Sequence, residues 1–261
     1  MPTVLISRNG PVATLSLNRP AARNALSPEL YGELAAALAQ CHGDRTVRVV
    51  ILTGQGDAFC AGGDLKAMAE RVEQGQAELR AYYAETVAAA ARQLHRLRQP
   101  VIARINGAAV GAGCSLALGC DLRIASEGAR FGLGFVTRGL IPDWGGSHLL
   151  PRAIGLSRAC ELVFTGRMIE VAEAERIGLV NRVVPAAGLD QAVAEVAAAI
   201  AAQPPEAVRL AKQALQAGAR STLDEALELE AVLQSYCCGT ADHREAVAAF
   251  RERREPHFTG R

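Results

Sequence analysis

The hydrophobic positions in the first half of the chain follow the patterns of β-strands. Residues 4–6 and 12–17 lie on either side of an Asn-Gly turn and predict a hairpin. The nearly continuous apolar runs 47–54 and 101–105 predict strands that are buried on both faces, and 122–125 predicts a third, shorter strand.

Stretches with helical spacing separate these strands. Ser27 and Pro28 have the residue types of a helix cap and first turn, and the leucines that follow them lie on one helical face. Helical spacing also predicts helices over 81–97 and 116–120. Strands that alternate with helices favour an α/β fold with mostly parallel strands.

From about residue 187 onward the pattern is helical, and no strand pattern recurs. We therefore expect two parts, an α/β core over residues 1–195 and a helical module over residues 196–261. The helices predicted in this region cover residues 189–202, 205–218, 223–236 and 244–254.

The composition excludes several classes of protein. The 28 basic and 27 acidic residues nearly balance, and only 4% of the residues are aromatic, so neither a basic stripe nor a base-stacking surface for nucleic acid is expected. The seven cysteines are irregularly spaced without a CxxC pair, which favours buried thiols in a reducing compartment. The sequence shows no signal-peptide pattern and no apolar run of membrane-spanning length. We expect a soluble, cytoplasmic protein that binds neither nucleic acid nor membrane.

Two glycine-rich turns are the first candidate for a functional site. One covers residues 56–66 and the other residues 106–114, and each is expected to lead from a buried strand into a helix. Ligands of α/β proteins bind at the carboxyl ends of strands, where helix N-termini also present unpaired N–H groups. Glycines at such places often serve the turn alone. Two turns together predict backbone amides that converge on one site, as in an oxyanion hole.

The spacing of the glycines does not fit a nucleotide-binding fold. Gly111 and Gly113 begin a GxGxxG pattern, but Leu116 occupies the place of its last glycine, and no acidic residue follows at the distance expected for a ribose contact. Neither turn matches GxxxxGK[ST].

Ordered motifs along the whole chain resemble those of the crotonase, or enoyl-CoA hydratase/isomerase, superfamily. The resemblance implies a spiral of repeated ββα units, a helical C-terminal module that builds a homotrimer or a dimer of trimers, and an acyl-CoA thioester as substrate. The stretches that carry it are 17–20, 23–26, 59–65, 100–107, 111–121, 139–146, 164–166 and 174–180.

The resemblance also implies roles for individual residues. The oxyanion hole falls on the N–H groups of Gly63 and Ala112, although the family typically has glycine at the second position. Phe135 and residues 67–83 are expected to lie at the acyl pocket. The coenzyme A part is expected near Arg23, Ala25, Ala61, Asp64 and Lys66, and near Phe250 and Arg253 of a neighbouring subunit. A solvated face, or helix packing for Phe250, is the simpler alternative for these last residues.

Two departures from the family bear on the reaction. Hydratases of the family use two glutamates to activate water, and this chain has Ser115 and Phe135 at the corresponding positions. A serine hydroxyl is too weak an acid to replace a carboxylate base, and a phenyl ring has no proton to exchange. The sequence therefore argues against water addition by that mechanism.

Asp143 is the remaining candidate for proton transfer. Aspartate at this position resembles the isomerase branch, and the stretches 139–147, 149–152 and 241–260 are most similar to the ring-epoxide isomerases that act on epoxyphenylacetyl-CoA. The neighbours Leu133, Phe135 and Trp144 are expected to desolvate the carboxyl group and raise its pKa. An N-cap of the following helix is the structural alternative, and both roles are compatible.

We therefore expect an acyl-CoA isomerase that shifts a double bond or opens a ring epoxide. The alternatives are an enoyl-CoA hydratase and a non-catalytic acyl-CoA-binding protein. A hydrolase built on Ser115 and His148 is disfavoured because residues 114–116 do not form a GxSxG elbow. The histidines show no metal-ligand spacing, and no cofactor is expected beyond the coenzyme A of the substrate.

Overall fold

The predicted strands form two sheets in the computed structural model, which describes residues 1–73 and 75–261. The larger sheet has the order β1-β2-β3-β5-β7-β10, and the smaller one has the order β4-β6-β8-β9. The larger sheet comprises Val4–Asn9 (β1), Val12–Leu17 (β2), Val49–Gly54 (β3), Val101–Ile105 (β5), Leu122–Ser126 (β7) and Arg182–Val184 (β10). The smaller sheet comprises Ala58–Cys60 (β4), Ala108–Val110 (β6), Arg130–Gly132 (β8) and Met168–Glu170 (β9).

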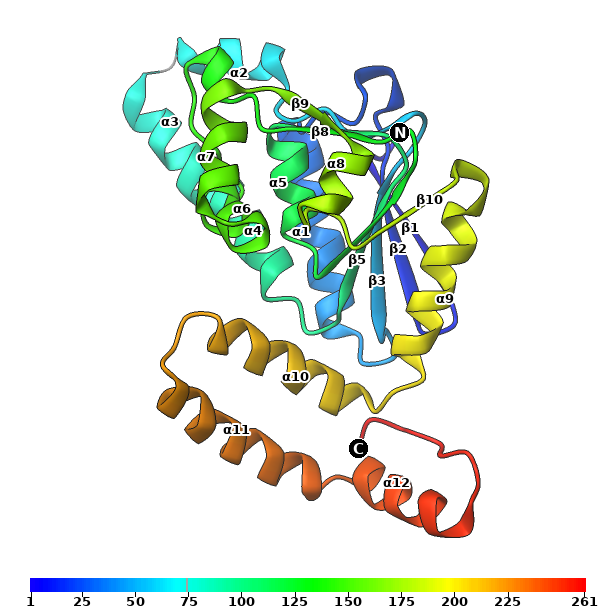
Figure 1. Cartoon of the computed structure of the whole chain (residues 1–261). Coiled ribbons are helices and arrows are strands. Elements are labelled where there is room, and N and C mark those ends of the chain that lie inside the picture. Colours follow the sequence, from blue (N-terminus) through cyan, green and yellow to red (C-terminus); the bar gives the residue numbers. More distant parts are fainter. Residues whose placement is uncertain (74) are drawn as a thin grey trace.

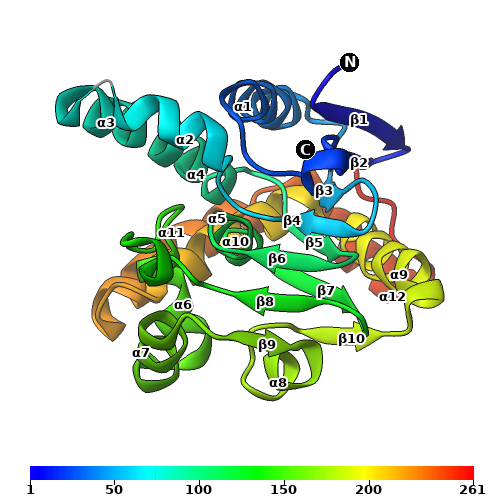
Figure 2. The same cartoon turned by 90° about the horizontal axis from the view of Figure 1, so that it is seen from above.

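Successive strands of the chain enter different sheets, and this alternation produces the spiral. The pairs β3–β4, β5–β6 and β7–β8 each add one strand to each sheet before a helix follows, as the predicted ββα repeat requires. The short strands β4, β6 and β8 lie side by side and parallel (Figure 2). Each glycine turn leads from a buried strand into a helix as expected, from β3 to α2 and from β5 to α5, and each also contains a short strand, β4 or β6, that the sequence did not predict.

The hairpin prediction is confirmed, and most predicted helices are found with shifted ends. Strands β1 and β2 pair antiparallel through Asn9 and Val12. The first helix has the predicted Ser27 cap, whose hydroxyl accepts a hydrogen bond from the Leu30 N–H. The helices of the core are Pro28–Gly43 (α1), Leu65–Val72 (α2), Gln76–Tyr82 (α3), Ala88–His95 (α4), Ala112–Leu118 (α5), Gly146–Ile154 (α6), Leu156–Thr165 (α7), Val171–Arg176 (α8) and Leu189–Ala201 (α9).

Two predicted helices differ from the structure in an informative way. The stretch 81–97 is helical as far as His95, but this helical segment begins earlier, at Gln76, and contains a π-helical turn over Tyr83–Val87 between α3 and α4. The helix predicted over 116–120 begins four residues earlier, at Ala112, because its first residues are too small to produce a periodic apolar signal.

The apolar residues form two clusters on either side of the larger sheet. The larger cluster fills the space between the two sheets and α1, α4 and α5, and the smaller one lies beneath α9. The division expected at residue 195 falls within α9, whose buried residues pack on the larger sheet. That division stays a prediction.

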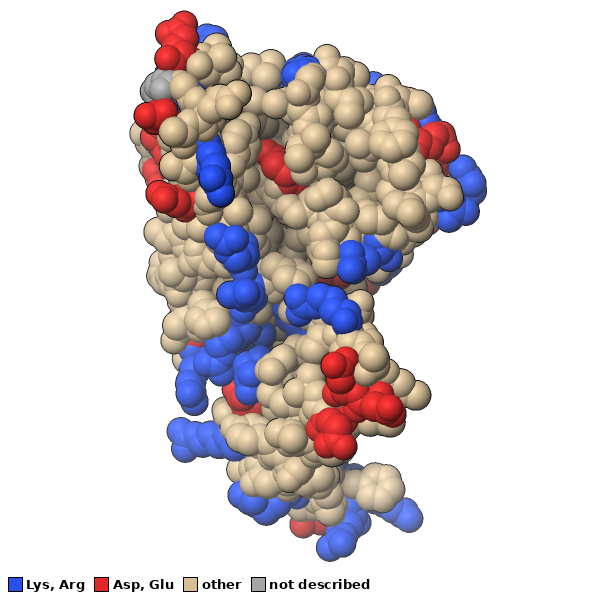
Figure 3. Space-filling model, turned by 90° about the vertical axis from the view of Figure 1, so that its left-hand side faces the viewer, with Lys and Arg blue, Asp and Glu red and all other residues tan. Residues whose placement is uncertain are grey.

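The last three helices lie apart from both sheets (Figure 1). They are Pro205–Gly218 (α10), Leu223–Cys238 (α11) and Ala241–Glu252 (α12). The Lys212 ammonium of α10 lies 2.6 Å from the Asp121 carboxylate of the core, and the Arg48 guanidinium donates to the carbonyl oxygens of Ala201 and Phe258. Lys and Arg side chains gather near the junction of the core with these helices on the face shown in Figure 3. Within the described residues, no helix is both long and apolar enough to cross a membrane.

Candidate active site

A pocket of about 560 Å³ lies where the two glycine turns meet the loop before α6. Its volume is in the range of small-molecule sites. Eight of the eleven residues that the sequence singled out line it, namely Ala25, Ala61, Gly63, Asp64, Lys66, Ala112, Phe135 and Asp143. The structure therefore brings together residues that are up to 118 positions apart in the sequence, although their roles stay predictions.

The first glycine turn presents the N–H group of Gly63 to this pocket. The residues on either side of Gly63 form the bridge to Leu26: the Leu26 N–H donates to the Gly62 oxygen at 2.8 Å, and the Asp64 N–H donates to the Leu26 oxygen at 3.2 Å. In a parallel bridge of this kind, the N–H of the middle residue points to the opposite side. Within the described residues, the Gly63 N–H donates to no backbone or side-chain acceptor.

The second glycine turn places Ala112 at the first position of α5. The N–H groups of a helix's first turn have no acceptor within the helix, and the Ala112 N–H has none elsewhere in the described chain. The two turns approach closely, because a Cβ atom on Gly62 would lie 3.4 Å from the Ala112 nitrogen and 2.7 Å from the Val110 oxygen. Gly62 also has a φ of +96°, which favours glycine. Both free amides thus belong to one pocket.

We expect Gly113→Ala to destabilise the protein, because Gly113 holds the two turns together. A Cβ atom at this position would lie 2.2 Å from the Cys60 carbonyl oxygen, which is backbone and cannot move aside easily. The expected loss is about 1–3 kcal/mol of unfolding free energy, measured by urea denaturation. Gly32→Ala is the control: this site in α1 has open space, so the same methyl group should leave stability unchanged or raise it by up to about 1 kcal/mol. Equal stability of the two variants would contradict this account of the turns.

Asp143 lies on a tight turn that directs it to the same pocket. Its carbonyl oxygen accepts a hydrogen bond from the Gly146 N–H at 2.7 Å. Two left-handed residues follow it, Trp144 with φ +54° and Gly145 with φ +78°. A left-handed conformation costs a non-glycine residue about 1–2 kcal/mol, so contacts of the Trp144 side chain must stabilise this turn.

The side chain of Asp143 is not the helix cap that the structural alternative required. The cap position of α6 is Gly145, and no side chain donates or accepts a capping hydrogen bond there. Among the described residues, the buried Asp143 Oδ1 has no hydrogen-bond partner. Burial raises the pKa of this carboxyl group from 3.8 to about 6, as the sequence predicted in direction. A carboxyl group that is desolvated and has an oxygen without a partner suits proton transfer near neutral pH.

The two positions at which the resemblance places the glutamates of a hydratase are Ser115 and Phe135, and they provide no second carboxylate. Phe135 lines the pocket with its ring, whereas Ser115 is fully buried behind it. A Cβ atom on Gly146 would lie 2.4 Å from the Ser115 Oγ, so the space around this hydroxyl is already filled. The Ser115 Oγ has no hydrogen-bond partner in the described chain, and His148 is exposed on α6. This geometry gives the serine-hydrolase alternative no nucleophile–base pair.

The loop expected to hold the coenzyme A part is fixed by Asn24, whose role the sequence reading missed. Asn24 is fully buried with φ +57°, and its side chain accepts from the Arg19 N–H and donates to the carbonyl oxygens of Gln55 and Ala58. A polar residue in an otherwise ordinary loop gave no periodic signal.

The neighbouring Arg23 is exposed with φ +48°. Its carbonyl oxygen accepts a hydrogen bond from the Ala61 N–H at 2.9 Å, but Arg23 does not line the pocket.

Asp64 and Lys66 differ in how freely they can meet a ligand. The Asp64 carboxylate caps α2 and lies 2.9 Å from the Arg19 guanidinium, so this side chain also has a structural role that the sequence reading missed. These contacts hold the pKa of Asp64 below its usual value, although burial opposes them. Lys66 is exposed, lines the pocket and makes no side-chain hydrogen bond or ion pair in the part of the chain that the structure describes, so its charge is available to a ligand.

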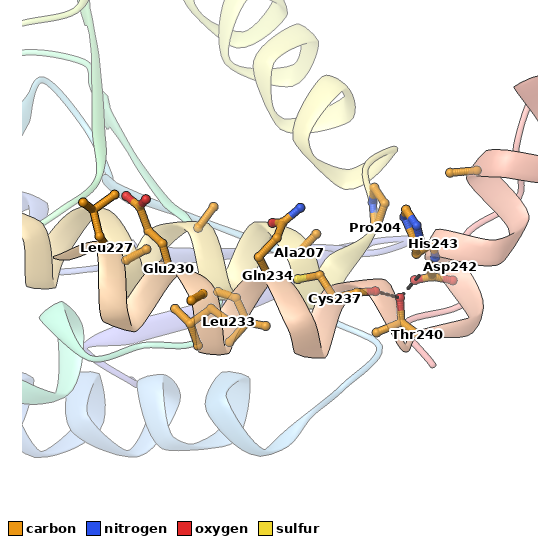
Figure 4. A pocket seen from close by; sticks show the side chains of 15 residues that line it. Pro204, Ala207, Leu227, Glu230, Leu233, Gln234, Cys237, Thr240, Asp242 and His243 are labelled. Carbon is orange, nitrogen blue, oxygen red and sulfur yellow. Dashed lines mark hydrogen bonds between the residues drawn. The ribbon is translucent and has the colours of Figure 1, made fainter. Parts of the chain in front are cut away.

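Phe250 and Arg253 do not lie at this pocket. Phe250 is on α12 with 85% of its surface exposed, and Arg253 ends the same helix in a left-handed conformation. Neither residue lines the groove of about 740 Å³ that Figure 4 shows among α10, α11 and α12. That groove has a largely apolar lining, including Leu227 and Leu233, with Asp242 and His243 at one end.

Metal ligation was not expected from the sequence. In residues 1–73 and 75–261, no three His, Cys, Asp or Glu side chains are grouped closely enough to hold a metal ion.

Of the range 67–83 that was expected at the acyl pocket, Met68 lines the pocket, and residue 74 lies outside the described residues.

Comparisons with known proteins agree along almost the whole chain. The family model described as enoyl-CoA hydratase/isomerase matches residues 7–261. A probable enoyl-CoA hydratase of Mycobacterium tuberculosis is 39% identical over 99% of this chain and 98% of its own length. The 1,2-epoxyphenylacetyl-CoA isomerase of Escherichia coli is also 39% identical, over 96% and 95%. The crystal structure of an enoyl-CoA hydratase from Bacillus anthracis superposes with a TM-score of 0.94 at 41% identity, covering 99% of this chain and 100% of that one.

Proposed function

Because the chain belongs to the enoyl-CoA hydratase/isomerase family, we propose that it is an acyl-CoA isomerase whose proton-transfer group is Asp143. One observation carries the choice of reaction. The pocket holds a desolvated carboxyl group whose Oδ1 has no partner in the described chain, while Ser115 and Phe135 stand where the sequence resemblance places the glutamates of a hydratase. A single carboxylate is enough to take a proton from one carbon and return it to another.

The two free amides supply the other half of the mechanism. The thioester oxygen accepts hydrogen bonds from the N–H groups of Gly63 and Ala112. Asp143 removes a proton from the carbon next to the thioester carbonyl. The electron pair of the C–H bond is then delocalised onto the carbonyl oxygen, and the two N–H donors stabilise the resulting enolate. Asp143 then returns the proton to a different carbon. Where the substrate carries an epoxide, the electron pair instead breaks a C–O bond of the ring, and the alkoxide that this releases takes the proton back from Asp143. The sum is an isomerisation that consumes no cofactor.

Two features support a coenzyme A thioester at the mouth of the pocket. Ala25 and Ala61 leave space there, and the ammonium group of Lys66 is available for a phosphate or an adenine contact. Arg23 is exposed beside them on the loop that Asn24 fixes. Asp64 contributes chiefly by holding Arg19 and the start of α2 in place.

A homotrimer or a dimer of trimers is part of the proposal. None of the sixteen described residues of α11 is buried, although its exposed residues include Leu223, Leu227 and Val232. A phenyl ring as exposed as that of Phe250 also favours a covering partner. In such an assembly, Phe250 and Arg253 would reach the coenzyme A of a neighbouring subunit, since they do not line their own chain's pocket. The cytoplasmic location stays a prediction.

Hydration of an enoyl-CoA is the second candidate, because most of the similar curated proteins are named as hydratases. A panel of thioesters separates the two reactions. We expect the purified protein to convert a 3-enoyl-CoA, or an epoxide derived from an arylacetyl-CoA, into its isomer, and to leave crotonyl-CoA unhydrated. Rapid hydration of crotonyl-CoA would contradict the proposal. Tight thioester binding with no reaction on any member of the panel would instead indicate a non-catalytic acyl-CoA-binding protein.

A further inference from the structure

Tyr31 and Trp144 form a buried contact directly behind the turn that carries Asp143. The Trp144 indole N–H donates a hydrogen bond of 3.0 Å to the Tyr31 hydroxyl, and the two rings stack with centroids 5.6 Å apart at 20°. Both side chains are almost completely buried. The contact joins α1 to the loop before α6, across 113 residues of sequence.

The backbone of Trp144 explains why such a contact is needed. A bulky aromatic residue rarely adopts a φ of +54°, and glycine would adopt it with little strain. The side chain therefore has to hold the backbone in place. Because Trp144 directly follows Asp143, any relaxation of its φ angle would rotate the Asp143 carboxyl group away from the pocket.

Tyr31 also connects this turn to α2 through the Tyr82 ring. Its ring meets the Tyr82 ring edge to face with centroids 6.1 Å apart, and the Arg71 guanidinium lies 3.6 Å from the centre of the Tyr82 ring. Arg71 belongs to α2, the helix whose Lys66 and Met68 line the pocket. One aromatic cluster thus holds the proton-transfer group and the pocket wall in a fixed relation.

We propose that the Tyr31–Trp144 pair is a positioning device that keeps the turn over residues 143–146 left-handed and the Asp143 carboxylate directed into the pocket. Neither residue contacts the reacting atoms in this proposal, and both act through Asp143. The inference rests on the proposed role of Asp143 as the proton-transfer group.

The groups that surround the Asp143 carboxyl group are mostly neutral and aromatic. Tyr31, Tyr82 and Tyr83 have raised pKa values, mainly because of burial, with a further contribution from the charge of Asp143. The charged residues on the same pocket are Arg19, Asp64, Lys66 and Arg138. If the Tyr31–Trp144 contact loosens, water reaches the carboxylate, and we expect its pKa to fall from about 6 toward the ordinary value.

The test uses two substitutions that each remove the same hydrogen bond and keep an aromatic ring. Tyr31→Phe removes the acceptor, and Trp144→Phe removes the donor. For each variant we expect kcat to fall by about tenfold with little change in KM, because the base is displaced while thioester binding is kept. The midpoint of the pH profile should move to lower pH. The double variant should lose no more than Trp144→Phe alone, because both substitutions remove the same hydrogen bond.

Two further measurements keep the proposal falsifiable. The pKa of Asp143, read by ¹³C NMR of carboxyl-labelled aspartate without substrate, should fall in both variants, and Gly32→Ala, which adds a methyl group in open space beside Tyr31 on α1, should change nothing. If Trp144→Phe does not fold, Tyr31→Phe carries the test alone. Unchanged kcat, pH midpoint and Asp143 pKa in folded Tyr31→Phe would overturn the positioning role. Full turnover by Asp143→Asn would instead overturn the proposed function, whatever the NMR titration shows.

Discussion

Asp143→Asn is expected to lower turnover of a 3-enoyl-CoA by about 10²–10⁴-fold, the usual contribution of a positioned acid–base group. The amide has nearly the same shape as the carboxyl group, but it cannot take a proton from carbon. KM should change little, because the contacts at the thioester oxygen and at the pocket mouth remain. Steady-state kinetics with a 3-enoyl-CoA measure both quantities. Turnover within a few-fold of the native enzyme would exclude Asp143 as the proton-transfer group.

The same carboxyl group gives the native enzyme a defined pH dependence. The base must be ionised, so kcat/KM should rise with pH through about 6, where burial places the pKa of Asp143. Stability should change in the opposite sense. The folded pKa lies above the unfolded value of 3.8, so this group favours folding most below pH 4, and that contribution is lost as the pH rises through about 6. Relative to Asp143→Asn, the native protein should lose up to about 3 kcal/mol across this window.

Ala112→Pro is expected to reduce kcat by about 10²–10³-fold, because it deletes one of the two N–H donors to the thioester oxygen. Proline is well tolerated at the first position of a helix, and Ala112 occupies that position in α5. The substitution removes the donor and puts the ring Cδ atom in the place of the amide hydrogen, so KM is measured together with kcat to detect any weaker binding of the thioester. It is the direct chemical test of a backbone group that no ordinary side-chain replacement can delete.

Ala112→Gly is the matched control for this experiment. Glycine keeps the N–H group and restores the residue type that the family typically has, so its activity should stay within a few-fold of the native value. Thermal unfolding of both variants shows whether α5 is intact. A folded Ala112→Pro variant with native kcat would show that this amide does not stabilise the enolate, and a large loss in Ala112→Gly would point to the methyl group instead.

The sequence predicted the longer elements of the core because their periodic patterns are strong. Strands β3 and β5 are nearly continuous apolar runs, and α10 has the predicted ends. The three-residue strands β4, β6 and β8 are too short to show alternation, and they exist because neighbouring strands of the second sheet supply their hydrogen bonds. The π-helical turn over Tyr83–Val87 likewise leaves no mark in the apolar spacing.

The candidate site was predictable where a motif names residue types and positions. The glycine turns and Asp143 could be placed in this way, and the structure brings them to one pocket. The contacts that hold these segments in place could not be predicted from the sequence. The hydrogen bond between Trp144 and Tyr31, and two of the three hydrogen bonds of the Asn24 side chain, depend on distant segments that meet only in the folded chain. Neither local pattern nor composition records such contacts.

The central claim is that Asp143 removes a carbon-bound proton from a thioester whose oxygen is held by two amides. Exchange of that proton with solvent deuterium, followed by mass spectrometry of a recovered acyl-CoA, tests it without requiring the physiological acyl group. We predict exchange at the carbon next to the thioester carbonyl by the native enzyme, and exchange at least about a hundredfold slower by Asp143→Asn. Equal exchange rates for the two proteins, or no exchange by the native enzyme on any bound thioester, would contradict the account.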